Sequence, residues 1–454
     1  MVAALLCTPL ASAIPVPQST TVPITDFNGD GYADLAIAAP QGTVAGAARA
    51  GFVSVVYGSS AGTDTSHPQN LSRATSWIPG EPTEDERFGS TTAARDLDGD
   101  GYTDLVVGGS DGRLILWGSS TGLNAAVSAG GTAAHVASGD VNGDGKGDLV
   151  LSSDNEVIVH FGPFSRSGIP SKTSSLPIDE EHTVWDIAVG DVTGDGKDDL
   201  LTTHGFEEDL YQSRFWKGTA TGFTPAYKNT GYTTYGGVIA DVDRDGYGDF
   251  VTRQVSDLEM MDYDAGELRI VYGSATGPST RTAKLSQDTA GVPGASEAGL
   301  QNGNTDDYGD QFGYSLTAGD VTGDGYPDIA VGVPGEDIGT TRDAGAVVLL
   351  KGSKSGLTGT GSQALNQSTA SVPGASEMGD TLGKAVVLAD VNANNRADLA
   401  LGAPSEDSTY QDSGAVWVFR GSKTGLTTTN IASFGPAALG APDNGSLFGL
   451  GFAR

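Results

Sequence analysis

The chain has 454 residues, a formal net charge of −32 at pH 7 and one cysteine, Cys7. So acidic a balance argues against a nucleic-acid partner, because phosphate contacts need a basic surface. The 67 glycines and the aromatic content of 7% favour turns and short strands. No segment carries a helical apolar period, and none approaches the length of about 18 apolar residues that predicts a membrane span.

The first 13 residues are similar to the end of a secretory signal, with an apolar core and an A-x-A site at Ala11–Ala13. They lack a basic start, so we expect the true start upstream. Residues 14–21 form a short proline-containing lead, and Thr21–Thr25 reads as a strand. Cys7 would leave with the signal. We therefore expect a secreted protein without disulfides, stabilised by metal instead.

A nine-residue pattern, D-x-[DNT]-x-D-G-x-x-D, is followed by an apolar run and recurs along the chain. Oxygen-bearing side chains at positions 1, 3, 5 and 9 suit a loop that wraps a hard cation, and glycine permits the tight bend. Seven copies make a repeat architecture. They begin at Asp26, Asp96, Asp140, Asp191, Asp241, Asp320 and Asp390.

Each unit reads as four short strands, which in the sixth unit are residues 312–318, 328–334, 345–352 and 364–369. Four antiparallel strands in seven units predict an all-β fold, a seven-bladed β-propeller in one domain. The expected blades are residues 20–86, 87–130, 131–180, 181–232, 233–307, 308–379 and 380–454.

The C-terminal segment, Leu447–Ala453, resembles a first strand that stops before any loop. An open ring would leave an unpaired strand edge, so we expect this segment to close the ring beside the N-terminal blade. Whether it or Thr21–Thr25 takes the inner position stays open at this stage.

The loops predict about six Ca²⁺ sites and a degenerate seventh one. Metal-free Asp-Gly turns are the alternative, but turn chemistry does not need carboxylates at positions 1, 5 and 9. Mg²⁺ suits such flexible oxygen sites less well. In the seventh loop Asn394 replaces the central aspartate and Asn395 the glycine, so we expect the weakest affinity there. The expected ligands, with backbone carbonyls from position 7, are Asp26, Asn28, Asp30, Tyr32, Asp34; Asp96, Asp98, Asp100, Tyr102, Asp104; Asp140, Asn142, Asp144, Lys146, Asp148; Asp191, Thr193, Asp195, Lys197, Asp199; Asp241, Asp243, Asp245, Tyr247, Asp249; Asp320, Thr322, Asp324, Tyr326, Asp328; and Asp390, Asn392, Asn394, Asp398.

Phe-Gly pairs at Phe88, Phe312 and Phe448, and the Gly402–Pro404 tripeptide, accompany these loops. Together they resemble FG-GAP repeats, the units of the integrin α-chain propeller, over about residues 20–450. Secreted bacterial FG-GAP proteins are the relatives we expect. The resemblance implies Ca²⁺ in the loops, a bidentate aspartate at position 9 and ligands on the loop-rich face. Units three to five lack the Phe-Gly pair, and Leu382 replaces phenylalanine in unit seven.

Two segments, Gly58–Gly62 and Gly118–Gly122, match the nucleophile pattern G-x-S-x-G. Other repeats keep the glycines and lose the central serine, which indicates a turn. The five histidines are scattered and form no zinc motif. We therefore expect no enzyme activity.

The long insertions lie between the second and third strands, and between blades, in units five, six, seven and one. This topology places them on the face opposite the calcium loops. We expect a monomeric adhesion or binding module there, for an extracellular protein or glycan. A carbohydrate-active enzyme or lectin, and an inert stability module, are the alternatives. The expected ligand residues are Glu336, Asp337, Arg342, Asp343, Glu406, Asp407, Tyr410 and Asp412, with Trp77 and Tyr263 as aromatic contributors.

Overall fold

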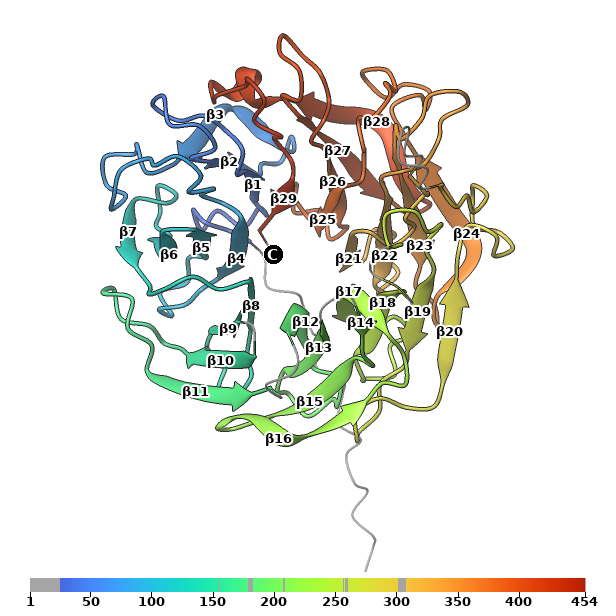
Figure 1. Cartoon of the computed structure of the whole chain (residues 1–454), viewed down its shortest axis with the longest axis horizontal. Coiled ribbons are helices and arrows are strands. Elements are labelled where there is room, and N and C mark those ends of the chain that lie inside the picture. Colours follow the sequence, from blue (N-terminus) through green and yellow to red (C-terminus); the bar gives the residue numbers. More distant parts are fainter. Residues whose placement is uncertain are drawn as a thin grey trace, which may run out of the picture.

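In the computed structural model the chain forms a ring of seven antiparallel sheets (Figure 1). The described residues are 25–153, 155–178, 183–206, 209–255, 257, 260–300 and 308–453. The predicted all-β class and seven-bladed propeller are confirmed. The predicted secretory signal lies outside the described residues. Within the described part no helix is long and apolar enough to cross a membrane.

Each blade runs from an inner strand near the centre of the ring to an outer strand at the rim. The first three blades are β29 (Gly451–Phe452), β1 (Leu35–Ala39), β2 (Phe52–Tyr57) and β3 (Asp64–Leu71); β4 (Thr91–Arg95), β5 (Asp104–Gly109), β6 (Gly112–Trp117) and β7 (Ala125–Ser128); and β8 (His135–Gly139), β9 (Asp148–Ser153), β10 (Glu156–Phe161) and β11 (Lys172–Pro177).

The fourth blade carries an additional short strand, β14, paired to β13. The last four blades are β12 (Thr183–Gly190), β13 (Asp199–Phe206), β14 (Asp209–Leu210), β15 (Arg214–Thr219) and β16 (Gly222–Asn229); β17 (Thr234–Ala240), β18 (Asp249–Gln254), β19 (Leu268–Val271) and β20 (Thr282–Leu285); β21 (Leu316–Gly319), β22 (Asp328–Val333), β23 (Ala346–Lys351) and β24 (Thr358–Leu365); and β25 (Ala385–Ala389), β26 (Asp398–Ala403), β27 (Ala415–Ser422) and β28 (Gly425–Phe434). A short 3-10 helix, η1 (Pro436–Leu439), follows β28.

The middle strands of a blade are buried on both faces because neighbouring blades pack against them. All six residues of β22 are buried, and so are five of the six in β23. Such strands read as continuous apolar runs. The outer strand β24 is half exposed and mixes polar with apolar residues.

Two expected strand positions are wrong. The first strand of blade 6 begins at Leu316 rather than at Phe312, because Phe312-Gly313 lies in a turn where Gly313 has φ 97°. The fourth strand is Thr358–Leu365 rather than residues 364–369. A turn begins at Asn366, where the Asn366 N–H donates to Thr369 Oγ1 at 3.0 Å.

The ring is closed by the C-terminal strand, as predicted. Strand β29 pairs antiparallel with β1, joining Ile37 to Phe452, and takes the inner position of blade 1 among the described residues. The Phe448 ring is fully buried and stacks on Phe52 with centroids 6.4 Å apart. Residues 451–452 therefore belong to the first blade and not, as expected, to the seventh.

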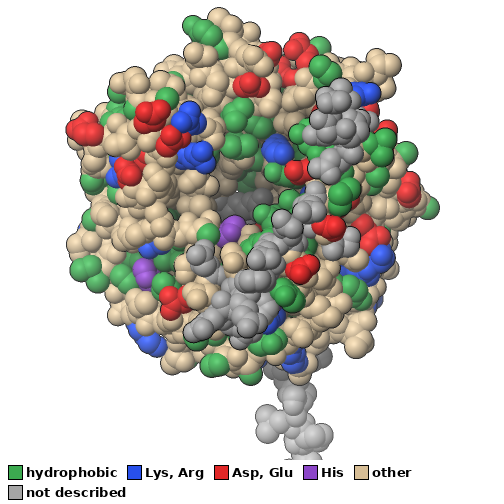
Figure 2. All heavy atoms as spheres, in the orientation of Figure 1, with side chains coloured by type: hydrophobic (Ala, Val, Ile, Leu, Met, Phe, Trp, Pro, Cys, Tyr) green, Lys and Arg blue, Asp and Glu red, His purple; other side chains and the backbone are tan. Residues whose placement is uncertain are grey.

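Two faces follow from this topology. The loop face carries the seven nine-residue loops (repeat loops 1–7) and the turns between third and fourth strands. The Ser119 N–H of one such turn, for example, donates to the Phe27 carbonyl of repeat loop 1. The insertion face carries the turns between second and third strands and the connections between blades. There the Gly379 N–H donates to the Arg342 carbonyl at 3.1 Å. Figure 2 shows one face of the ring, hollowed at its centre.

Candidate functional site

The repeat loops fold around their first aspartate. In repeat loop 1, Asp26 Oδ1 accepts the Gly29 N–H at 2.6 Å and Asp26 Oδ2 accepts the Gly31 N–H at 2.8 Å. The position-5 aspartate, Asp30, accepts the Tyr32 N–H at 3.0 Å through Oδ1. The same bonds from position 1 to the position-6 N–H recur in all seven loops. The backbone therefore holds these carboxylates in place.

The aspartate at position 9 is buried and ties each loop to the turn between the third and fourth strands. Asp34 Oδ2 accepts the Phe27 N–H at 2.8 Å, and Oδ1 accepts the Gly58 N–H at 2.9 Å. A matching glycine N–H binds Asp104, Asp148, Asp199, Asp249, Asp328 and Asp398. This carboxylate thus has a structural role in addition to the predicted ligand role.

Burial raises the pKa of every position-9 carboxyl, against the lowering effect of these backbone bonds. The pKa of Asp249 is raised to about 8, and those of Asp34, Asp104 and Asp328 to about 7. The pKa of Asp148, Asp199 and Asp398 rises to about 6. Neighbouring loop aspartates add to the effect by charge repulsion in each case.

Two loops bring three carboxylates close enough to hold one ion. Ligand atoms of Asp96, Asp98 and Asp104 lie within 4.8 Å of one another, and so do those of Asp241, Asp243 and Asp249. These are positions 1, 3 and 9 of repeat loops 2 and 5, the loops with an aspartate at position 3. The donors are carboxylate oxygens, which fit a hard cation.

Basic side chains reach into some loops, and the sequence pattern did not reveal them. Arg166, from the neighbouring blade, pairs with Asp98 at 2.5 Å and also contacts Asp100. Arg281 pairs with Asp243 in repeat loop 5. The two loops with an extra aspartate therefore each have an arginine that compensates it. No loop-adjacent motif marks Arg166 or Arg281, since both come from turns that only the fold brings near.

Repeat loops 4 and 7 also contact basic groups. Lys217 Nζ lies 2.9 Å from Asp195, and Arg420 lies 3.5 Å from Asp398. In repeat loop 7 Asn392 Nδ2 donates to Asp398 Oδ2 at 2.5 Å. Among the described residues, repeat loops 1, 3 and 6 have no such ion pair. The seven loops thus differ in net charge, with the lowest negative charge in loop 7.

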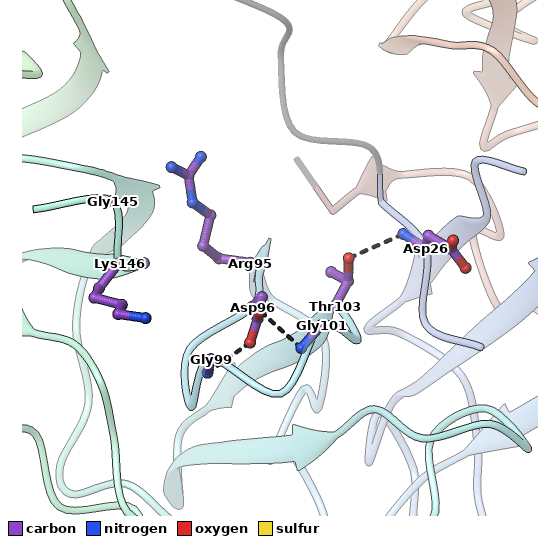
Figure 3. Close-up of a pocket in the computed structure, with 9 residues that line it drawn as sticks. Asp26, Arg95, Asp96, Gly99, Gly101, Thr103, Gly145 and Lys146 are labelled. Carbon is purple, nitrogen blue, oxygen red and sulfur yellow. Dashed lines mark hydrogen bonds between the residues drawn. The ribbon is translucent and has the colours of Figure 1, made fainter. Parts of the chain in front are cut away.

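A pocket of about 370 Å³ opens between repeat loops 1, 2 and 3. Figure 3 shows Asp96 bonded to the amides of Gly99 and Gly101, with Arg95 projecting away from the loop. The Lys146 side chain extends toward repeat loop 2. Asp26 and Thr103 join the first two loops through a 2.9 Å hydrogen bond.

The expected ligand residues on the insertion face fall into two matching turns and divide by exposure. In one turn Asp337 accepts the Asp343 N–H at 2.9 Å, and in the other Asp407 accepts the Asp412 N–H at 2.8 Å. Arg342, Asp407 and Tyr410 are exposed, and the other five are half-buried. The carboxylates of Glu336 and Glu406 accept hydrogen bonds from the side-chain amides of Gln287 and Gln367, respectively.

Of the two expected aromatic contributors, Tyr263 is buried and Trp77 is half-buried. Tyr263 is only 9% exposed, with Tyr308 stacked at 5.8 Å, and Trp77 packs against the core of blades 1 and 2. The outward-facing rings of this face are Tyr308 and Tyr410, which are 46% and 45% exposed.

The two G-x-S-x-G segments are turns between a third and a fourth strand. In both, the first serine closes the turn: Ser59 Oγ and Ser119 Oγ each donate to a glycine carbonyl at 2.7 Å. Ser353 and Ser422 make the same bond where the central serine is missing. The shared bond explains the pattern without catalysis.

Known proteins share this repeat. Residues 20–56, 312–350 and 382–419 match the FG-GAP repeat, and residues 96–151 and 140–202 match an FG-GAP-like repeat. Integrin alpha-PS5 of Drosophila melanogaster is 31% identical over 147 residues, which cover 32% of this chain and 13% of that protein. Phosphatidylinositol-glycan-specific phospholipase D of Bos taurus is 36% identical over 123 residues, covering 26% of this chain and 14% of that protein. The chain therefore spans a small part of these relatives.

Solved structures are similar at a coarser level. A lectin from Agrocybe aegerita that recognises non-reducing terminal N-acetylglucosamine has 16% identity and a TM-score of 0.44, over 76% of this chain and 79% of that chain. The complex of BBS1N with ARL6DN contains a chain with 13% identity and a TM-score of 0.42, over 75% and 80%.

Proposed function

We propose that this FG-GAP β-propeller is a secreted, calcium-stabilised binding or adhesion module for an extracellular protein or glycan. Its ligand surface is the insertion face of blades 5 to 7. The repeat loops on the opposite face hold Ca²⁺ and fix the blades relative to one another. The module itself is not catalytic.

The distribution of exposed apolar side chains carries the ligand part of the proposal. Eight large hydrophobic side chains of the described residues are exposed. Five of them belong to the insertion face of blades 5 to 7, and exposed apolar groups gathered on one surface are typical of interaction sites. They are Met260, Leu300, Tyr308, Met378 and Tyr410.

The calcium part rests on the donors of the repeat loops. In repeat loop 6, Asp320, Thr322, Asp324 and Asp328 supply only oxygen ligands, and loop amides orient Asp320 at 2.6 Å and 2.7 Å. Bound Ca²⁺ supplies the positive charge that the clustered carboxylates lack. Repeat loops 1 to 6 provide the full ligand pattern, and repeat loop 7 a degenerate one. The likeness to integrin α chains supports the same conclusion.

A second candidate function is a carbohydrate-active enzyme or lectin on the same scaffold. Relatives named as phospholipases D keep catalysis open as a question for experiment. Against catalysis stand the two serine motifs, whose first hydroxyls serve as turn bonds. A ligand that is cleaved, rather than bound, would decide for the enzyme.

The test is binding of the Ca²⁺-loaded protein to arrayed extracellular glycans and matrix proteins. A Met378→Ala/Tyr410→Ala variant should lose the bound ligand. The matched control is Ile169→Ala/Tyr227→Ala, which removes exposed apolar groups of 65% and 41% exposure away from the insertion face. Equal loss in both variants, or in neither, would contradict a ligand surface on blades 5 to 7.

A further inference from the structure

Three connections between blades on the insertion face begin with the same turn. We call residues 72–78, 286–292 and 366–372 the first, second and third connection turns. In each, the first residue donates its N–H to a threonine hydroxyl, at 3.2, 3.0 and 3.0 Å. The threonine carbonyl then accepts the N–H of the seventh residue. Arg73, Gln287 and Gln367 therefore occupy equivalent positions.

Each of the three connections also contains a buried carboxylate near its end. It stands two residues before the Phe-Gly pair or its Leu-Gly variant, as Glu86, Asp310 and Asp380. The exposed fractions of these residues are 0%, 2% and 2%. Burying a charge without a partner is costly, so each carboxylate requires a compensating group.

In the first connection turn that group is a cation from the chain itself. Arg73 Nε donates to Glu86 Oε1 at 2.6 Å, and Arg73 Nη1 donates to the Pro79 carbonyl at 2.6 Å. Both side chains are at most 8% exposed. The guanidinium neutralises Glu86 and leaves the site with no net charge.

In the third connection turn the cation is missing and a second acid is present. Gln367 Nε2 donates to Glu406 Oε2 at 2.6 Å, and Gln367 also lies beside Asp380, where it counteracts the raised pKa of that carboxyl. Glu406 comes from the turn between β26 and β27. Among the described residues, no lysine, arginine or histidine pairs with Asp380 or Glu406. Two carboxylates thus share one neutral amide.

The side-chain amide of Gln367 gives a second, independent indication of a bound cation. Gln367 is 2% exposed, and its Oε1 atom is buried without a hydrogen-bond partner. Turning the carboxamide by half a rotation places Oε1, instead of Nε2, against the two carboxylates. Three oxygen donors from two segments, the β24–β25 connection and the β26–β27 turn, would then face one point, which suits a hard cation. Gln287 repeats the pattern, with a bond to Glu336 and an unpartnered Oε1.

We propose that the second and third connection turns bind a divalent cation on the face opposite the repeat loops, in the place that Arg73 fills in the first. In the third turn the protein ligands are Asp380, Glu406 and Gln367 Oε1. Three protein ligands leave the remaining positions to water, which reaches the half-buried Glu406. The affinity belongs with the weaker class of extracellular sites, with Kd about 10⁻⁴–10⁻³ M.

Trp417 provides a local reporter. Its indole N–H donates to the Pro373 carbonyl at 2.9 Å. A Cβ built on Gly374 would lie 3.5 Å from Trp417 Cζ2 and 3.7 Å from Gln367 Nε2, so the indole and the carboxamide flank the same glycine. Terbium bound at Asp380 is therefore close enough to be sensitised by Trp417.

The experiment titrates Tb³⁺ into the full chain and records tryptophan-sensitised emission. Asp380→Asn and Gln367→Arg should each remove one weak component, the latter by restoring the arginine of the first turn. The matched control Ser368→Arg adds the same charge at an exposed neighbour and should keep that component. Glu406→Gln serves if Asp380→Asn fails to fold, which near-UV circular dichroism reports.

The proposal would be overturned if emission were unchanged in Gln367→Arg and also in Asp380→Asn or Glu406→Gln. The two acids would then share a proton instead of a cation. Equal loss in Ser368→Arg would also overturn it, because a general charge effect would then suffice. The repeat loops are intact in all these variants. If the repeat loops failed to bind calcium, the titration would lose its tighter component and not the weak one. That result would therefore be distinguishable from a failure of the present proposal.

Discussion

The buried aspartate at the end of each repeat loop connects two turns before any ion is considered. In repeat loop 6, Asp328 Oδ1 accepts the Gly352 N–H at 3.0 Å, while Oδ2 accepts the N–H groups of Val321 and Thr322 at 3.0 and 3.1 Å. One residue therefore satisfies three buried donors. Single-residue changes should separate this structural role from ion binding.

Asp328→Asn should destabilise the protein even in the presence of a chelator. Asparagine replaces one accepting oxygen by an amide, so at least one buried N–H loses its acceptor, at a cost of about 1–3 kcal/mol. Urea unfolding in EDTA measures the change. The control Asp324→Asn alters an exposed loop carboxylate. It should leave stability in EDTA nearly unchanged and lower only the stabilisation by Ca²⁺. Equal destabilisation in EDTA by both would contradict the structural role.

The metal-free protein should become less stable as pH rises from about 5 to 8. Burial raises the pKa of Asp34, Asp104 and Asp328 to about 7 and that of Asp249 to about 8, against an unfolded value near 3.8. The folded state therefore binds more protons in this window, and its stability falls as these carboxyls ionise. Melting temperatures in EDTA across this range check the sign. With saturating Ca²⁺ the ionised form is favoured, so the Ca²⁺-induced rise in Tm should grow with pH.

At the scale of elements, the turns between third and fourth strands place basic side chains next to the repeat loops and so reduce the net negative charge of those loops. Arg281 contacts Asp243 of repeat loop 5 and also donates to the Ser355 carbonyl at 2.9 Å. A fixed cation next to a cation site lowers affinity by Coulomb repulsion and competes for a ligand oxygen. The extra aspartate and the arginine thus offset each other.

Arg281→Ala should lower Tm in EDTA and enlarge the rise in Tm on adding Ca²⁺. The first effect follows because Asp241, Asp243 and Asp249 lose their compensating charge, and the second because the competing cation is gone. Lys284→Ala is the matched control in the same blade. Its ammonium pairs with Glu267 at 2.6 Å, outside any repeat loop. A larger Ca²⁺ response in Lys284→Ala than in Arg281→Ala would refute local tuning.

The sequence predicted the number and type of strands better than the residues at which they begin and end. Seven repeats with apolar runs fixed the number of blades, because the middle strands are buried on both faces and their residues are nearly all apolar. The outer strand β24 is half exposed and mixed in polarity, so its position was misjudged by several residues. Arg166 and Arg281 were missed because their role depends on contacts between turns distant in sequence. Periodicity carries no information about such contacts.

For the whole molecule, ring closure depends on a very short strand. Strand β29 has two residues, and its partner β1 has five. Buried aromatic packing supports it: Phe448 lies between Phe52 and Phe434, each with centroids 6.4 Å away. The preceding Phe-Gly turn, rather than strand length, therefore holds the ring together.

Deleting residues 446–454 should lower Tm sharply, and Phe448→Ala should cost about 3–5 kcal/mol. Thermal unfolding with and without Ca²⁺ measures both. Phe448→Leu is the matched control, because Leu382 occupies the equivalent place before blade 7 and is 1% exposed. It should retain most of the stability. A deletion with unchanged Tm would show that β29 does not close the ring.

Because β29 lies at the C-terminal end of the described chain, blade 1 can be completed only late in synthesis. Strand β1 is synthesised first among the described strands, yet its inner partner comes about 400 residues later. At about 5–20 residues per second, translation of that interval takes roughly 20–80 s. Throughout this interval the inner edge of blade 1 lacks β29 and is open to wrong pairing. Whatever shields that edge during synthesis, including the early folding of the later blades, governs the yield of correctly closed rings.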